Sequence, residues 1–275
     1  MKIKTLIEQS NRPLVMGIVN LTPDSFSDGG KFNQLDAALK QVEKMQDAGV
    51  DILDLGGEST RPGATYVEVE EERRRVIPAI QAIQSRFDIP ISVDTYKPEI
   101  MQDAIELGVE LINDIRALEM PGALEVLAKS DTEVCLMHMQ GNPVSMQVSP
   151  SYDDVIHEVY NYLLNRIQAC ESAGIGKNRI ILDPGFGFGK TVEHNYQLLA
   201  KFELFKSLDC PLLAGLSRKS MLGAVVNKEP AQRVSASVAG AVISALNGAN
   251  IIRVHDVAET IDALKVVEAT LKGEK

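Results

Sequence analysis

The feature that most constrains the fold is a regular alternation of short apolar runs with longer segments whose apolar residues recur at helical spacing. Eight runs have the length and composition of buried strands, at residues 14–20, 51–56, 90–95, 110–115, 133–139, 179–184, 211–216 and 250–255. Helical patterns lie between them, including residues 35–48, 69–86, 98–107 and 152–173. Alternation of strand and helix predicts an α/β fold with a parallel sheet.

Three glycines indicate how the helices connect to the strands. Gly49, Gly108 and Gly248 each stand one or two residues before an apolar run, in AGVDILD, LGVELIND and NGANIIRV. Glycine at this place is typical of a left-handed helix cap, so the connections from helix to strand are short. The connections from strand to helix are long and polar, notably residues 20–34 and 57–69. We therefore expect function at the carboxyl ends of the strands.

Eight strand-helix units favour a closed (β/α)8 TIM barrel over an open sheet. The chain has 275 residues, and such a barrel needs about 250, so length permits a single domain over residues 1–275. No proline-rich or serine-rich linker interrupts the sequence. The alternative, an open doubly wound sheet, is less favoured because a G-x-G-x-x-G segment does not follow the first strand.

Composition limits the partners and the compartment. The net charge of −10 argues against general nucleic-acid binding, so an anionic ligand requires a local cluster of positive groups. No stretch approaches the roughly 20 apolar residues of a membrane helix, and the first residues do not read as a secretory signal. Cys135, Cys170 and Cys210 lack C-x-x-C spacing, which favours buried inert thiols in a reducing cytoplasm; a catalytic cysteine is the lesser alternative. We expect a cytoplasmic protein.

Polar or ionisable residues end every apolar run. They are Asn20, Asp54, Glu58, Asp94, Asn113, Asp114, His138, Asp183, Ser217, Lys219, Arg253 and His255. Any one of them can be explained as a residue that caps the next helix. Because the carboxyl ends of the strands meet at one mouth of a closed barrel, the whole set predicts a ligand site.

The last strand predicts binding of a phosphorylated ligand. Arg253 and His255 are two residues apart and share a face, at a place where barrels often bind phosphate. Arg61, in GGESTRPG, adds a second guanidinium unless it is a surface residue. The segment DPGFGFGKT is not a nucleotide-binding loop, because Pro184 stands where that loop needs glycine. Its glycines instead suit a flat ligand with Phe188 against it.

Buried carboxylates without matching positive charge predict a ligand that donates hydrogen bonds. Asp94, Asn113 and Asp183 suit a heterocycle that presents an amino group beside a ring N–H. The segment SRKS, which opens the helix after the seventh run, suits a carboxylate. Paired carboxylates for glycoside hydrolysis are less favoured because the chain has no tryptophan, and the four histidines lack zinc-ligand spacing.

At this point the motifs resemble a family, the bacterial dihydropteroate synthases, which are pterin-binding TIM barrels. The segments that carry the resemblance run in order along nearly the whole chain: MGIVNLTPDSFSDGG, DLGGESTRPG, SVDTYKPE, INDI, LMHMQGNP, DPGFGFGK, SRKS and RVHD. The resemblance implies condensation of 6-hydroxymethyl-7,8-dihydropterin diphosphate with p-aminobenzoate, giving 7,8-dihydropteroate and diphosphate in folate biosynthesis. Such transferases are inhibited by sulfonamides, which mimic p-aminobenzoate.

The resemblance also implies roles for individual residues. The pterin would be held by Asp94, Asn113, Asp183, Lys219 and Arg253. Of these, the catalytic residues would be Asp94, Asp183, Lys219 and Arg253. The diphosphate would be bound by Asn20, Arg61, Arg253 and His255, with a Mg²⁺ ion on Asn20 and Asp28. The p-aminobenzoate pocket, completed by the first two long loops, would comprise Phe26, Thr60, Pro62, Phe188, Lys219 and Ser220. A homodimer is implied too, with the small-residue helix at 236–246 suited to close packing.

Three other functions share parts of this pattern. A pterin-dependent methyltransferase domain would share the barrel and the carboxylates but would not release diphosphate. An aldolase would form a Schiff base on Lys219 and would be trapped by borohydride. A catalytically silent module would bind the dihydropterin diphosphate without joining it to p-aminobenzoate.

Overall fold

The computed structural model of the chain describes residues 2–22, 31–61, 63–142 and 145–273. Its strands are parallel and lie in one sheet in the order β6-β5-β4-β3-β2-β1-β8-β7. They are β1 (Leu14–Asn20), β2 (Ile52–Gly56), β3 (Ile91–Asp94), β4 (Leu111–Asp114), β5 (Glu133–Met137), β6 (Ile180–Asp183), β7 (Leu213–Ala214) and β8 (Ile251–Val254). A parallel bridge between Leu182 and Leu212 joins the two ends of the sheet. The strands therefore form the expected eight-stranded barrel.

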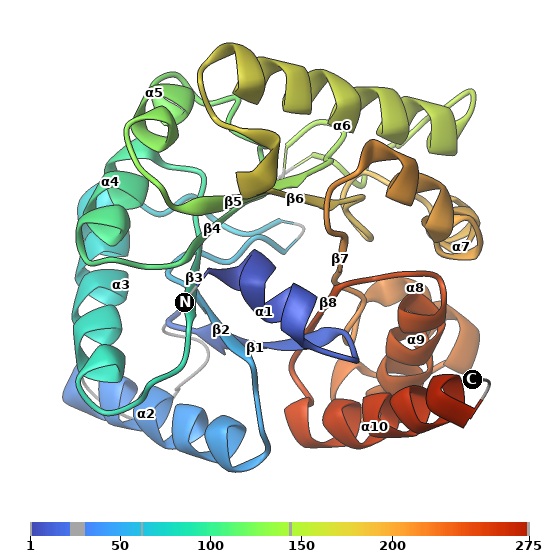
Figure 1. Cartoon of the computed structure of the whole chain (residues 1–275), viewed down its shortest axis with the longest axis horizontal. Coiled ribbons are helices and arrows are strands. Elements are labelled where there is room, and N and C mark those ends of the chain that lie inside the picture. The colour runs from blue at the N-terminus through green and yellow to red at the C-terminus, as the bar shows by residue number, and fades with distance from the viewer. Residues whose placement is uncertain (1, 23–30, 62, 143–144, 274–275) are drawn as a thin grey trace.

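Helices surround the barrel as an outer ring, in chain order (Figure 1). They are α2 (Lys31–Asp47), α3 (Val69–Gln84), α4 (Pro98–Glu106), α5 (Ala123–Ala128), α6 (Val155–Ser172), α7 (Val192–Ala200), α8 (Ser220–Val226), α9 (Val234–Leu246) and α10 (Val257–Gly273). Short 3-10 helices occur at η2 (Lys177–Arg179), η3 (Phe202–Leu208) and η4 (Pro230–Gln232). Within the described ranges, no helix is long and apolar enough to cross a membrane.

A further helix, α1 (Ile3–Gln9), lies across the amino-terminal end of the barrel (Figure 1). Ile3 packs with the residues that point into the barrel at the start of the strands, such as Met16 and Ile251. The carboxylate of Glu133, at the start of β5, accepts hydrogen bonds from the amides of Ile3 (2.5 Å) and Lys4 (3.1 Å). A negative acceptor at a helix amino terminus stabilises the helix, so Glu133 fixes α1 over this end.

The glycine caps and the strand ends set the geometry of the opposite end. Gly49, Gly108 and Gly248 have φ of +87°, +79° and +93°, which confirms the left-handed caps. β1 and β2 end at the expected residue, and the other six strands stop one or two residues before the ends of the apolar runs. After β7, for example, the amide of Lys219 donates to Leu216 O at 3.0 Å and turns the chain into α8. Polar side chains after the strands therefore lie at the rim of the barrel.

Candidate active site

Charged side chains from three strands meet directly at the carboxyl-terminal mouth. Nε of Arg253 donates to Oδ2 of Asp54 at 2.6 Å, and its Nη2 donates to Oδ2 of Asp94 at 2.8 Å. Nδ2 of Asn113 lies 3.3 Å from the same oxygen of Asp54. The closed barrel thus brings together β2, β3, β4 and β8, as the pattern of polar strand ends predicts.

Asp54 is the residue at the centre of this group; the sequence placed it among the polar strand ends at the mouth but assigned it no part in binding a particular ligand. It is fully buried, and its second oxygen accepts from Oγ of Ser92 at 2.6 Å. A buried carboxylate is stable only when charges or donors compensate it, and Arg253, Ser92 and Asn113 do so here. The available signal was an aspartate inside the otherwise apolar strand ILDLG.

Asp94 has an incomplete set of hydrogen bonds. Its Oδ2 is held by Arg253, but its Oδ1 is buried and has no hydrogen-bond partner among the described residues. Burial raises the pKa of Asp94 to about 7, although the positive charge of Arg253 counteracts the rise. A buried acceptor without a donor is costly, so this oxygen is suited to a donor that arrives with a ligand.

Asp183 and Lys219 form the other side of the mouth. Oδ1 of Asp183 accepts from the amide of Gly185 at 2.7 Å, and burial raises its pKa despite the nearby ammonium of Lys219. Lys219 donates to the carbonyl of Phe186, and its Nζ lies 4.6 Å from the ring centre of Phe188. Burial lowers the pKa of Lys219 to about 8, because the effect of Asp183 is smaller. A cation and a carboxylate thus lie beside Asp94. The three buried carboxylates at this mouth, Asp54, Asp94 and Asp183, are called the acidic floor below.

The glycine-rich loop after β6 is held by a buried lysine and does not have the form of a phosphate loop. Nζ of Lys190 donates to the carbonyls of Gly185 (2.8 Å) and Phe188 (3.0 Å) and to Nδ1 of His138 (2.9 Å). Burial lowers the pKa of Lys190, and burial next to that lysine lowers the pKa of His138 to about 2. A Cβ on Gly185 would lie 1.9 Å from the carbonyl oxygen of His138. The glycine therefore permits this loop to pack against the end of β5.

Cationic groups gather on the rim beside Arg253. His255 contacts Oγ of Ser217 through its amide (3.1 Å) and through Nδ1 (3.0 Å). Its pKa is lowered to about 4 by burial, then by the charges of Arg253, Arg218 and Arg61. His255 is therefore neutral and offers a hydrogen bond, while the arginines supply the charge. Asn20 is the last residue of β1.

The residues expected around p-aminobenzoate are placed as follows. Phe188 is almost buried, packed with Tyr96 and Met137 beside Lys219. Thr60 is half-buried on the loop after β2, and Ser220 is the exposed first residue of α8. Phe26, Asp28 and Pro62 lie outside the described residues.

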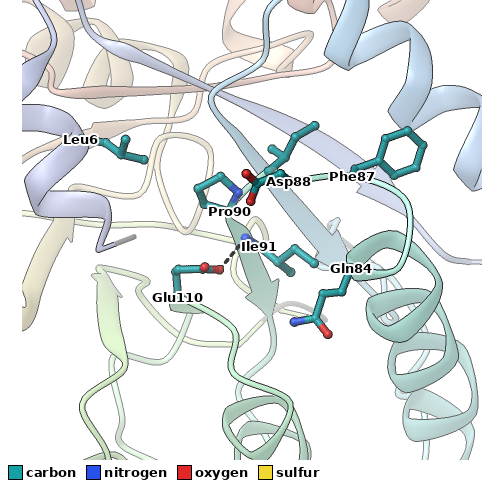
Figure 2. Close-up of a pocket in the computed structure, with 8 residues that line it drawn as sticks. Leu6, Gln84, Phe87, Asp88, Pro90, Ile91 and Glu110 are labelled. Atoms are coloured by element: carbon teal, nitrogen blue, oxygen red, sulfur yellow. Dashed lines mark hydrogen bonds between the residues drawn. The ribbon is translucent and has the colours of Figure 1, made fainter.

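Two hollows lie away from this mouth, and neither has its buried carboxylates. One, of about 300 Å³, lies at the amino-terminal end, between Leu6 of α1, Gln84 of α3 and Pro90 before β3 (Figure 2). Its Glu110 accepts from the amide of Ile91 at 2.9 Å, a contact that links adjacent strands. The other, of about 400 Å³, lies between the starts of α6 and α7. The carboxyl-terminal mouth is therefore the site to which the chemistry is assigned.

The barrel, its acidic floor and its cationic rim define an enzyme that binds a flat, phosphorylated heterocycle. The model of the family described as "Pterin binding enzyme" matches residues 16–255, and the chain belongs to that family. Within it, the chain groups with the dihydropteroate synthases, which are transferases. It is 56% identical to dihydropteroate synthase of Escherichia coli K12 over 265 residues, which cover 96% of this chain and 94% of the relative.

Solved structures of dihydropteroate synthases are similar to this chain in fold. The Yersinia pestis dihydropteroate synthase with a sulfonamide drug has a TM-score of 0.91 and 54% identity, and covers 95% of both chains. The Xanthomonas albilineans enzyme with 4-aminobenzoic acid has a TM-score of 0.90 and 51% identity, and covers 94% of this chain and 93% of that one. Both the fold and the family expected from the sequence are confirmed.

Proposed function

We propose that the chain joins 6-hydroxymethyl-7,8-dihydropterin diphosphate to p-aminobenzoate, giving 7,8-dihydropteroate and diphosphate, and that the diphosphate leaves before the amine attacks. The observation that carries this proposal is the buried Oδ1 of Asp94, which has no hydrogen-bond partner among the described residues, in a floor of carboxylates. A pterin ring presents an amino group beside a ring nitrogen. It can therefore supply the donors that such a carboxylate lacks.

The pterin lies, in this proposal, on Asp94, Asn113 and Asp183, with Lys219 at its edge. All four polar groups come from different strand ends of one mouth, so a single flat ligand can contact them together. Nη2 of Arg253 donates to Oδ2 of Asp94 in the structure. When the ring donates to Asp94, the guanidinium keeps its contact with Asp54 through Nε and can turn its outer N–H groups toward the ring and the phosphates.

The diphosphate is bound at the rim by Arg253, Arg61, His255 and Asn20. Guanidinium groups suit phosphate oxygens because they donate two parallel hydrogen bonds. The charges of Arg253 and Arg61 both act on His255, which supports one shared anion site. The neutral imidazole then donates a hydrogen bond without adding charge.

The chemistry follows from this division between floor and rim. The bond from the exocyclic methylene carbon to oxygen breaks, and its electron pair leaves with the diphosphate. The electron-rich pterin delocalises the positive charge, which the carboxylates beneath it stabilise. The neutral amine of p-aminobenzoate attacks the carbon and then loses a proton to solvent or to the released diphosphate. The protein must position the amine and need not deprotonate it.

The p-aminobenzoate ring is assigned to the space beside Phe188 and Lys219, near Thr60 and Ser220. Phe188 offers an aromatic edge, and the ammonium of Lys219 and the hydroxyl of Ser220 suit the carboxylate of the substrate. Phe26 and Pro62 belong to the same assignment but lie outside the described residues.

A Mg²⁺ ion fits the residues at the anion site. Among the described residues, no group of three His, Cys, Asp or Glu side chains could hold a metal. Mg²⁺ often takes one or two protein oxygens and completes its shell with phosphate and water, and Asn20 offers such an oxygen. Asp28, the second proposed ligand, lies outside the described residues. When bound, the ion would neutralise charge on the diphosphate. Calorimetry of diphosphate binding with and without Mg²⁺, in wild type and Asn20→Leu, tests this: we expect Mg²⁺ to tighten binding in wild type only.

We also propose a cytoplasmic homodimer. The three cysteines are free and buried, which suits a reducing compartment. Exposed apolar side chains occur on two helices that pack together, Ile243 and Leu246 on α9 and Val266 and Leu271 on α10. Light scattering should give twice the chain mass for wild type and one chain mass for Ile243→Glu. A monomeric wild type would contradict the dimer.

The reaction itself is tested by incubating purified protein, Mg²⁺ and the pterin diphosphate with labelled p-aminobenzoate, and measuring labelled dihydropteroate. Product should form with wild type and fail with Asp183→Ala, Lys219→Ala or Arg253→Ala, while circular dichroism shows that each variant is folded. Wild type that binds both substrates without joining them would instead be a silent pterin-binding module.

A further inference from the structure

A buried lysine outside the mouth contacts both ends of the loop that carries Thr60 and Arg61. This loop connects β2 to α3, and its described residues, 57–61 and 63–68, are called loop 57–68 below. Nζ of Lys97, the residue before α4, donates to a carboxylate oxygen of Glu58 and to the carbonyl of Val67 at 2.6 Å. Glu58 lies at the start of the loop and Val67 near its end. One ammonium group therefore joins the two ends.

The same ammonium is anchored to the outer ring of helices. It also donates to the carboxylate of Glu72 on α3, and the ring centre of Tyr66 lies 4.7 Å away. The side chains of Lys97 and Glu72 are only 3% and 1% exposed, and that of Glu58 is 10% exposed. Burial alone would lower the pKa of Lys97, but its bonds to Glu58 and Glu72 outweigh this and raise it. The lysine is therefore charged throughout the physiological range.

Further contacts stiffen the first residues of the loop. The hydroxyl of Tyr96 donates to the other oxygen of Glu58 at 3.0 Å, and Nη1 of Arg75 donates to the carbonyl of Gly57 at 2.8 Å. A Cβ on Gly57 would lie 2.6 Å from Val76, so the chain passes close against α3 here. Arg61 follows a few residues later and is near enough to His255 to influence its charge state.

We propose that Lys97 is a positioning residue: it clamps loop 57–68 at both ends and so places Arg61 for the departing diphosphate and Thr60 for p-aminobenzoate. Lys97 itself contacts neither of those residues in the described contacts, and it acts through Glu58 and Val67. The inference rests on the proposed function for its substrates, but its binding test does not require turnover.

The test compares Lys97→Met with wild type in two equilibrium titrations. One uses inorganic diphosphate, which probes the rim, and the other uses 6-hydroxymethyl-7,8-dihydropterin without its diphosphate, which probes the floor. A charge-assisted contact is worth roughly tenfold or more in affinity. We expect Lys97→Met to weaken diphosphate about tenfold and to leave the pterin within about threefold. Steady-state assays should give a matching rise in KM for p-aminobenzoate, with a smaller change in kcat.

Arg73→Met is the matched control. Arg73 bridges Glu70 of α3 and Asp103 of α4, so it joins the same two helices without touching the loop. Arg73→Met should lower the melting temperature, but it should not weaken diphosphate binding more than pterin binding. Lys97→Arg, which keeps the charge, should recover most of the diphosphate affinity.

Several results would overturn the clamp. One is an equal loss of diphosphate and pterin affinity in Lys97→Met. Another is a loss in Arg73→Met that is also larger for diphosphate than for the pterin. The third is a Lys97→Arg variant whose diphosphate affinity is no better than that of Lys97→Met. If Lys97→Met does not fold, Glu58→Gln replaces it in the titrations. This variant should lose diphosphate affinity too, by a smaller factor. An unchanged diphosphate affinity would count against the proposal. A wild type that binds diphosphate and pterin but makes no dihydropteroate would refute the proposed function and leave these binding comparisons decisive for the clamp.

Discussion

The ion pair between Arg253 and Asp54 predicts that substitutions at these two residues are strongly coupled in their effect on the free energy of unfolding. It predicts no such rescue of catalysis. Arg253→Met leaves the fully buried Asp54 with Ser92 and Asn113 as its hydrogen-bond donors among the residues that the structure describes. Removing one partner of a buried pair costs about 3–5 kcal/mol. Asp54→Asn alone loses a charge-assisted hydrogen bond, about 1.5–3 kcal/mol, because Arg253 keeps Asp94 and is 20% exposed.

The double variant should be much less damaged than the sum of the single ones. Without the carboxylate of Asp54, loss of the guanidinium no longer leaves that charge unpaired. We therefore expect a coupling free energy of about 2 kcal/mol or more, measured by urea-induced unfolding of the four proteins at pH 8. The double variant should nevertheless make dihydropteroate as slowly as Arg253→Met, because the cation is still missing from the rim.

A second cycle on Arg12 and Asp51 serves as the control. That pair is also in contact, at 2.7 Å, but it lies at the other end of the barrel and both side chains are partly exposed, 17% and 22%. Its coupling should stay near or below about 1 kcal/mol, with no effect on turnover. A coupling below about 0.5 kcal/mol between Arg253 and Asp54, or turnover restored by adding Asp54→Asn, would refute the reasoning.

Further predictions concern pH, backbone and thiols. Because the pKa of Lys219 is lowered to about 8, its charge is lost above that pH, so kcat/KM for the pterin diphosphate should fall there. Lys219→Arg, which keeps the charge, should abolish this fall. If the fall persists in Lys219→Arg, another group causes it. Gly185→Ala should reduce the free energy of unfolding by about 3 kcal/mol or more, because φ is +74° and the new Cβ would lie 1.9 Å from an oxygen. Gly49→Ala, with φ of +87° and no atom within 4 Å, should lose only about 1 kcal/mol in the same urea titration. Cys135 is buried and its pKa is raised by burial, so Ellman's reagent should label it only in denaturant; labelling of Cys135 in the folded protein would contradict this burial.

The sequence predicts the barrel well because its evidence is periodic and repeated. Each strand run is apolar on both faces, and each is followed by polar residues, so all eight strands fall where they are expected. The caps at Gly49, Gly108 and Gly248 are equally local, since a positive φ depends on the residue itself. The sequence does not predict the helix α1, because it is short. Its apolar residues, Ile3, Leu6 and Ile7, are explained only by their packing against the amino-terminal end of the barrel.

The site is predicted in part, and what is missed depends on contacts between distant residues. Polar strand ends identify Asp94, Asp183 and Arg253 as members of one mouth. No spacing rule shows that Arg253 pairs with Asp54, because 199 residues separate them. Lys97 was missed for the same reason: in SVDTYKPE it reads as a polar residue before a helix, and its partners lie on a loop and on α3.

The acidic floor also explains how a chain of net charge −10 holds an anionic substrate. Three carboxylates, Asp54, Asp94 and Asp183, are buried at the mouth, and the charge of Asp54 contributes to the raised pKa of Asp94, so the barrel needs a cation among them. Arg253 fills that need, and all three carboxylates favour its charged form. The floor that binds a neutral heterocycle therefore also keeps a guanidinium charged and oriented at the rim, where the phosphates must bind. A substitution that removes floor charge should for this reason weaken diphosphate binding as well as pterin binding, whereas a change confined to the loop that carries Thr60 and Arg61 should affect diphosphate and p-aminobenzoate and leave pterin binding nearly unchanged.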